Sequence, residues 1–151
     1  AVTQTKRGVC VIDDFAHNPA KIAAAVNTAR GMLPEGSGRL IAVYQPHGFG
    51  PTRFLKDEYI TTFRAIFRQG DSLYLLPIYY AGGTANRNIS SEEIIEGLAP
   101  VAFNARAVKD RGELLAGIEA EARPGDCVIV MGARDPALPV LVEKIVNLFA
   151  E

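Results

Sequence analysis

The sequence predicts an α/β fold, a Rossmann-like three-layer αβα sandwich built on a mostly parallel sheet of five to six strands. Short apolar runs alternate with segments of helical periodicity, which is the pattern of right-handed βαβ crossovers. The runs are continuously apolar, as expected for strands that helices cover on both faces of a sheet. The strand candidates are Val9–Ile12, Leu40–Tyr44, Leu73–Leu76, a weaker Val101–Phe103, and Val128–Met131.

The first two helices are expected to follow the first two strands. Asn18 is a good N-cap residue, and Pro19 stands in the first turn, where its missing N–H costs nothing. The second helix is expected after Thr52, and Gly70 marks its end. Each helix has one apolar stripe at helical spacing. The stripes are Ile22, Val26, Ala29 and Leu33 in the first helix, and Leu55, Tyr59, Phe63 and Ile66 in the second.

Three further helices are indicated by their opening residues. Two of them begin with capping boxes, in which the first and the fourth residue each satisfy a backbone N–H of the other's turn. Ser90 pairs with Glu93 in one box, and Asp110 pairs with Glu113 in the other. The last helix is expected to open on Asp135-Pro136, in the manner of the first helix, and to pack as the closing layer.

The length of 151 residues indicates a single domain over residues 1–151. Hydrophobic residues make up 48% and charged residues 22%, which excludes disordered, coiled-coil and disulfide-scaffold classes. Because 17 acidic residues balance 16 Lys and Arg, we expect no nucleic-acid partner. No apolar run approaches the roughly 20 residues that span a bilayer, and the N-terminus lacks a signal-peptide pattern. We therefore expect no membrane contact and a cytoplasmic location.

Both cysteines, Cys10 and Cys127, stand in apolar runs and lack a CxxC pattern. Free cysteine packs as a small hydrophobe, so we interpret them as buried thiols. A disulfide or a reactive thiol is the alternative interpretation.

Chemistry is expected where the strands end, because ligands of open α/β sheets bind beyond the carboxyl ends of the strands. Both histidines of the chain, His17 and His47, fall at this predicted edge. The segments expected there are Asp13–Asn18, Gln45–Arg53, Tyr79–Gly83 and Gly132–Asp135.

The pair Asp13-Asp14 allows three interpretations. The two carboxylates could bind Mg²⁺, one of them could accept hydrogen bonds from ribose hydroxyls, or one could only cap the loop. Arg53 and Arg134 are candidates for anion recognition, because the guanidinium fork suits carboxylate and phosphate. Arg53 is the stronger candidate, since a cation in the first turn of a helix is disfavoured until an anion binds.

Other catalytic classes lack their residues. A phosphorelay receiver domain needs an aspartate after the third strand and a lysine after the fifth, where this chain has Pro77 and Gly132-Ala133-Arg134. The histidines and cysteines lack zinc-ligand spacing, so no metal site is predicted from them. The chain has neither a G-x-S-x-G elbow nor a G-x-x-x-x-G-K-[ST] phosphate loop. Alone, it is not expected to activate ATP in the P-loop manner.

Several motifs, in order, resemble the C-terminal domain of the Mur ligases, the ATP-dependent enzymes that add amino acids or peptides to UDP-N-acetylmuramic acid. The segment Val11–Pro19 resembles the motif that opens that domain, and Gln45-Pro46-His47 with Thr52-Arg53 is similar to the alanine-adding members. The likeness continues in Pro77-Ile78-Tyr79, Ala81-Gly82 and Met131-Gly132-Ala133, and so covers nearly the full chain.

The resemblance implies a ligase with N-terminal UDP-binding and central ATPase domains besides this one. ATP phosphorylates a carboxylate to an acyl phosphate, which the incoming amine attacks to form an amide in cell-wall peptidoglycan biosynthesis. ATP and Mg²⁺ would be held mainly by the central domain, so the isolated domain is expected to be inactive. Its partners would be a UDP-N-acetylmuramate-type substrate, an amino acid or peptide, and the two other domains in cis.

The resemblance also implies roles for individual residues. Asp14 matches an aspartate near the ATP ribose, and His17 and Asn18 match positions beside the nucleotide. His47 and Arg53 match catalytic positions near the incoming amino acid and the reacting end of the muramyl substrate. The remaining substrate-binding candidates are Tyr79, Gly82 and Arg134.

The chain departs from the family at Gly48, where alanine-adding members usually carry an arginine, and it lacks the Asp-Asn-Pro-Arg signature of diaminopimelate-adding members. The amine that is added therefore stays open. Two other functions also stay open: a stand-alone, non-catalytic module that binds a nucleotide or a UDP-sugar, and a small Mg²⁺-dependent enzyme that uses Asp13, Asp14 and His17.

Overall fold

The computed structural model describes residues 1–35, 37–80, 82, 87–132 and 135–151. Within these residues, six strands form one sheet in the order β1-β2-β6-β3-β4-β5. The strands are β1 (Val2–Gln4), β2 (Cys10–Asp14), β3 (Leu40–Tyr44), β4 (Ser72–Leu75), β5 (Asn104–Ala107) and β6 (Cys127–Met131). The helices are α1 (Pro19–Arg30), α2 (Phe49–Ile66), α3 (Ser91–Leu98), α4 (Arg111–Glu121) and α5 (Leu138–Leu148).

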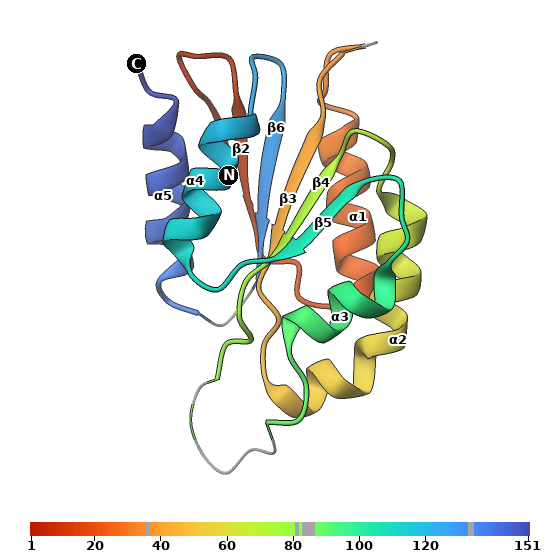
Figure 1. Ribbon diagram of the computed structural model, residues 1–151. Coiled ribbons are helices and arrows are strands. Elements are labelled where there is room, and N and C mark those ends of the chain that lie inside the picture. Colours follow the sequence, from red (N-terminus) through yellow and green to blue (C-terminus); the bar gives the residue numbers. More distant parts are fainter. Residues whose placement is uncertain (36, 81, 83–86, 133–134) are drawn as a thin grey trace.

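Helices cover both faces of the sheet, with α1, α2 and α3 on one face and α4 and α5 on the other (Figure 1). Alternate residues of each central strand enter different cores. In β2, for example, Ile12 packs toward α1 and Val11 toward α5. All neighbouring strands are parallel except β1 and β2. The predicted three-layer sandwich with a mostly parallel sheet is therefore confirmed.

The two edge strands differ from the prediction. The strand β1 was not predicted; it is short, exposed and antiparallel to β2, with Val2 opposite Ile12. The weak strand candidate Val101–Phe103 is wrong, because the strand β5 lies directly after it, over Asn104–Ala107. Phe103 instead packs its ring 5.3 Å from that of Phe67, beside α2. An edge strand needs only one buried face, so its apolar signal is weak.

The predicted start of α1 is confirmed. Asn18 Oδ1 accepts a hydrogen bond from the Lys21 N–H at 2.9 Å, and Pro19 is the first helical residue. The predicted start of α2 after Thr52 is wrong, since the helix begins at Phe49 with Gly48 as N-cap. Thr52 lies inside the first turn, where its hydroxyl donates to the Gly48 carbonyl at 2.6 Å.

The capping boxes at α3 and α4 are half formed. Ser90 Oγ accepts from the Glu93 N–H at 3.2 Å, and Asp110 Oδ1 accepts from the Glu113 N–H at 2.8 Å. The glutamates bind elsewhere: Glu93 accepts from Lys56 at 3.1 Å, and Glu113 accepts from the Lys109 N–H at 3.2 Å.

The last helix does not open on Asp135-Pro136 as predicted, because α5 begins at Leu138. The Asp135 carboxylate accepts from the Ala137 N–H at 2.8 Å and closes a turn before the helix. Arg111 binds the same carboxylate and ties this turn to the start of α4.

Two buried aspartates fix the amino ends of the central strands. Asp71, directly before β4, accepts from the Leu40 N–H at 3.2 Å and from Arg30 at 2.8 Å. Asp126, directly before β6, accepts from the Arg39 N–H at 2.9 Å and from the Arg39 guanidinium at 3.0 Å. Both aspartates are only 3% exposed, so each carboxylate depends on these partners. Together they tie the start of β3 to both of its neighbours.

The two cysteines are free, buried thiols, as the sequence predicts. They lie opposite each other in the β2–β6 register. Burial, with a smaller contribution from Cys10, raises the pKa of the Cys127 thiol. In the described part of the chain, no helix is long and apolar enough to cross a membrane.

Gly117 of α4 makes room for Tyr74 of β4. A Cβ atom at this position would lie 2.9 Å from the Tyr74 hydroxyl oxygen, which a hydrogen bond to Glu121 holds in place. We predict that Gly117→Ala lowers the free energy of unfolding by about 1 kcal/mol, because overpacking costs about 1–3 kcal/mol and outweighs the roughly 1 kcal/mol gain in helix propensity. Urea unfolding followed by circular dichroism measures the change.

The matched control is Gly112→Ala in the same helix. Gly112 is exposed, and the nearest atom to its Cβ would be Asp110 Oδ1 at 3.4 Å. This variant should be as stable as the parent or more stable. If Gly117→Ala proves more stable than Gly112→Ala, the packing argument is wrong.

Candidate functional site

The candidate site lies at the carboxyl ends of the parallel strands, the lower edge of the sheet in Figure 1. Asp14 is the last residue of β2, and His17 and Asn18 follow in the loop to α1. His47 lies in the loop after β3, and Tyr79 lies in the loop after β4. These loops therefore share one end of the sheet, as predicted.

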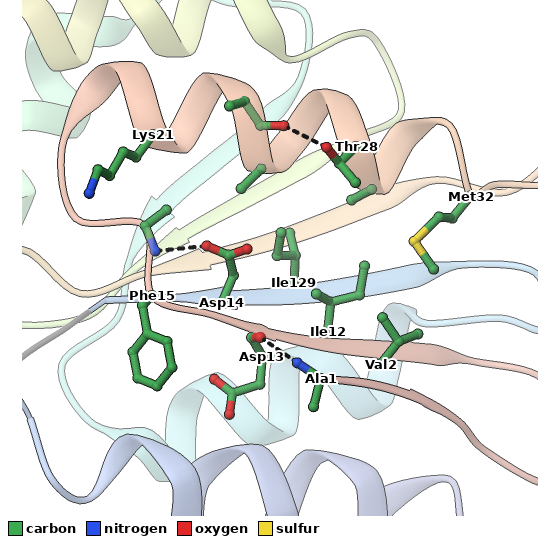
Figure 2. Close-up of a pocket in the computed structure, with 14 residues that line it drawn as sticks. Ala1, Val2, Ile12, Asp13, Asp14, Phe15, Lys21, Thr28, Met32 and Ile129 are labelled. Atoms are coloured by element: carbon green, nitrogen blue, oxygen red, sulfur yellow. Dashed lines mark hydrogen bonds between the residues drawn. The ribbon is translucent and has the colours of Figure 1, made fainter.

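In the loop after β2, the two adjacent aspartates diverge. Asp14 points to the α1 side of the sheet and Asp13 to the α5 side (Figure 2). One oxygen of Asp14 accepts from the Ala16 N–H at 2.8 Å, so this residue does cap the loop. The His17 ring is exposed and bonds through Nδ1 to the Phe15 carbonyl at 3.1 Å. Because the carboxylates diverge, this geometry does not make them joint ligands of one ion.

A groove of about 510 Å³ runs between α1 and the edge formed by β1 and β2 (Figure 2). Asp13, Asp14 and Lys21 line it together with apolar and small residues, and the Asp13 carboxylate points to the other face of the sheet (Figure 2). Three large apolar side chains on the groove are unusually exposed, Phe15 at 70%, Val2 at 50% and Met32 at 44%. The groove thus places a carboxylate and an ammonium beside an apolar surface, an arrangement that suits an amphipathic ligand.

Two buried tyrosine side chains stabilise the loop between β2 and α1. Tyr44, the last residue of β3, donates from its hydroxyl to the His17 carbonyl at 3.2 Å. The hydroxyl of Tyr59, on α2, lies 2.7 Å from that of Tyr44. Burial is the main cause that raises the pKa of both phenols above 10.0. The phenols therefore connect the β2–α1 loop to β3 and to α2 while they remain neutral.

The raised phenol pKa values predict how stability depends on pH. Below pH 10 the phenols are neutral in both the folded and the unfolded chain, so they add no pH dependence. Above pH 10 the unfolded chain ionises first, and the free energy of unfolding falls by up to about 1.4 kcal/mol per pH unit for each buried phenol. Urea unfolding at pH 9, 10 and 11 measures this slope.

The double variant Tyr44→Phe/Tyr59→Phe serves as the comparison. It removes both phenols, so its stability should fall less steeply than that of the parent between pH 10 and pH 11. Equal slopes for the two proteins would show that these phenols do not limit stability at high pH.

A pair of backbone hydrogen bonds joins the loops after β3 and β4. The Tyr79 N–H donates to the Pro46 carbonyl at 2.8 Å, and the Gly48 N–H donates to the Tyr79 carbonyl at 2.9 Å. The His47 and Tyr79 rings stack with centroids 6.3 Å apart and planes at 25°. Gly48 has φ +75°, and a Cβ there would lie 3.1 Å from Pro51 Cδ. The conformation of this turn thus favours glycine at the position where the sequence departs from the family.

Two of the remaining predicted residues are described: Arg53 stands in α2, and Gly82 stands in the segment after β4. Arg53 is exposed in α2 and donates to the Asn88 carbonyl at 3.4 Å. Gly82 is exposed, with φ +107°. Arg134 lies outside the described residues. Arg53 thus reaches across to the segment that precedes α3.

Sequence reasoning missed a cluster beside these residues. The Arg87 guanidinium lies over the rings of Tyr80 and Phe49, 4.5 Å and 5.5 Å from their centroids. Lys21 at the groove was also missed. Isolated arginines and lysines have no sequence pattern that separates a ligand-binding side chain from a solvated one, so only their position in the fold brings them out.

The fold is that of an open α/β domain, a class in which ligands bind at the loops beyond the carboxyl ends of the strands. The family model described as "Mur ligase, glutamate ligase domain" matches residues 1–134, which include the loops after β2, β3 and β4. The chain therefore belongs to the Mur ligase family. A UDP-N-acetylmuramate–L-alanine ligase of Sorangium cellulosum is 36% identical over 129 residues, which are 85% of this chain and 27% of that protein. The chain thus spans about a quarter of the length of this relative.

Solved structures share the fold. A domain from a protein described as a UDP-N-acetylmuramate:L-alanyl-gamma-D-glutamyl-meso-diaminopimelate ligase of Haemophilus ducreyi has a TM-score of 0.69 at 25% identity, covering 99% of this chain and 98% of that one. The MurF ligase of Thermotoga maritima, solved with ADP, has a TM-score of 0.58 at 14% identity, covering 99% of this chain and 29% of that one. The second likeness concerns the fold alone.

Proposed function

We propose that this chain is the C-terminal domain of an ATP-dependent ligase that joins an amino acid or peptide to UDP-N-acetylmuramate or a related substrate. The reaction passes through an acyl phosphate: the carboxylate attacks the γ-phosphorus of ATP and releases ADP, and the amine then displaces phosphate to form the amide. The observation that carries this proposal is the 36% identity to an L-alanine ligase over 85% of the chain.

The nucleotide side of the proposed site is the loop after β2. Asp14 lines the groove and uses one carboxylate oxygen to cap the loop. Its other carboxylate oxygen would accept hydrogen bonds from the ribose hydroxyls. His17 and Asn18 would lie beside the nucleotide. Asn18 uses its carbonyl oxygen to cap α1, so its amide NH₂ is the group left for a ligand. The central domain would hold most of the ATP and the Mg²⁺.

The substrate side would be formed by the loops after β3 and β4. His47 and Arg53 would act near the acyl phosphate and the amine, where a guanidinium stabilises developing negative charge. Tyr79 stacks on His47 and would hold its ring in place. Gly82 and Arg134 remain proposed substrate contacts.

The proposed ligase needs the N-terminal UDP-binding and central ATPase domains in the same protein. Closing of the domains would then bring the two halves of the active site together and exclude water. The isolated 151 residues lack a phosphate loop and should not release ADP.

The aspartate pair provides a matched test in the ligase that contains this chain. We predict that Asp14→Ala lowers kcat/KM for ATP at least about tenfold, equivalent to roughly 1.4 kcal/mol of transition-state stabilisation. Asp13→Ala should stay within about twofold of the parent, because Asp13 points to the other face of the sheet (Figure 2). ADP release in the presence of UDP-N-acetylmuramate and L-alanine is the measurement. Equal effects of the two variants would contradict the nucleotide assignment.

Arg53→Ala tests the substrate side in the same assay. We predict a loss of at least about tenfold in ligation rate, since a charge-assisted contact to an anion is worth roughly 1.5–3 kcal/mol. The KM for ATP should change little. Wild-type kinetics in Arg53→Ala would show that Arg53 is not part of the site. A parent protein that binds nucleotide but releases no ADP would instead favour a non-catalytic binding module.

A further inference from the structure

Arg87 is held in an unusual setting for an exposed arginine. Its guanidinium lies 4.5 Å from the Tyr80 ring centroid and 5.5 Å from the Phe49 ring centroid. The two rings themselves pack 5.6 Å apart at 59°. We call these three residues the Arg87 cluster. Contact with two rings restricts the guanidinium to a defined position, which lowers the entropy lost when it binds a ligand.

Each member of the Arg87 cluster adjoins a part of the proposed substrate side. Phe49 is the first residue of α2, two positions after His47. Tyr80 directly follows Tyr79, which bonds to the loop of His47. Arg87 directly precedes Asn88, whose carbonyl accepts from Arg53. The backbone bridge between the loops and the contact of Arg53 therefore both fix the cluster beside the proposed substrate site.

The chemistry of the cluster is that of an anion site with an apolar wall. Aromatic contacts engage the face of a guanidinium and leave its N–H groups, which lie in the plane, for a carboxylate. Among the described residues, neither Arg53 nor Arg87 has a carboxylate within 4.0 Å. The cluster therefore combines an available guanidinium fork with two rings that can contact apolar parts of a ligand.

The strand order separates this position from the nucleotide side. Asp14 and the groove belong to β2, whereas the loops of the Arg87 cluster follow β3 and β4, with β6 between β2 and β3. Among the reactants of the proposed ligase, the incoming amino acid or peptide carries a carboxylate that does not react. A planar fork beside aromatic rings matches this carboxylate and the side chain next to it.

We propose that Arg87 binds the unreacting carboxylate of the incoming amino acid or peptide and so selects amines that carry one. The inference rests on the proposed ligase function. It assigns the recognition of the second substrate to a residue of the segment before α3, held by Phe49 and Tyr80. Arg87 takes no part in the phosphoryl transfer, so its loss should weaken binding of the amine without changing the chemical step.

The test uses Arg87→Ala in the ligase that contains this chain, with L-alanine and its neutral analogue L-alaninamide as amines. We predict that the variant raises KM for L-alanine about tenfold or more, with kcat and the KM for UDP-N-acetylmuramate within about twofold of the parent. L-Alaninamide should have a raised KM with the parent ligase, and Arg87→Ala should not raise it further. Arg87→Lys keeps the charge but loses the guanidinium fork, so its KM for L-alanine should lie between those of the parent and of Arg87→Ala.

Arg106→Ala is the matched control, because Arg106 is also exposed over an aromatic ring, 5.3 Å from the Tyr74 centroid, but stands on the edge strand β5 and pairs with Glu113. All its KM values should equal those of the parent. Unchanged KM for L-alanine in Arg87→Ala overturns the inference, as does an equal rise for L-alanine and L-alaninamide, which indicates loss of structure only. A parent ligase that releases no ADP with any amine overturns the proposed function itself, and the inference with it.

Discussion

The loops of the candidate site depend on a short backbone bridge beyond the ends of β3 and β4. Two hydrogen bonds of 2.8 and 2.9 Å join Tyr79 to Pro46 and Gly48, and they continue the parallel ladder past the strands. The bridge brings the His47 ring against Tyr79 and fixes Gly48, the N-cap of α2. Because α2 begins there, the positions of Phe49 and Arg53 follow from it. One local pairing therefore places most of the proposed substrate side.

Contacts at the amino ends of the central strands explain why their carboxyl ends are aligned. Asp71 and Asp126 are buried directly before β4 and β6, and both accept hydrogen bonds from backbone N–H groups at the start of β3. A buried carboxylate that loses such partners is costly, so these contacts define the register of the three strands. The phenol of Tyr44 then links β3 to the loop after β2. Polar contacts at both ends thus position an otherwise apolar sheet.

The central strands and α1 could be predicted because burial on both faces and a proline-bearing cap leave direct sequence signals. The strand β1 and the bounds of β5 could not, since edge strands carry few apolar residues and their place depends on pairing. The start of α2 was missed because a glycine N-cap with positive φ has no side-chain signal. Motif resemblance singles out Asp14, His47 and Arg53 as candidates, but no motif points to Arg87, which is distant in sequence from Phe49. Only folding brings its guanidinium over Phe49 and Tyr80.

We propose that the carboxyl edge of this sheet closes over the nucleotide and the reacting groups of a ligase. The structure of the ligase that contains this chain, determined with a non-hydrolysable ATP analogue, tests it most directly. We predict that a carboxylate oxygen of Asp14 lies within about 3.2 Å of a ribose hydroxyl, the range of a hydrogen bond. A bound analogue held wholly by other domains, with Asp14 facing solvent and no contact from this edge, would contradict the account.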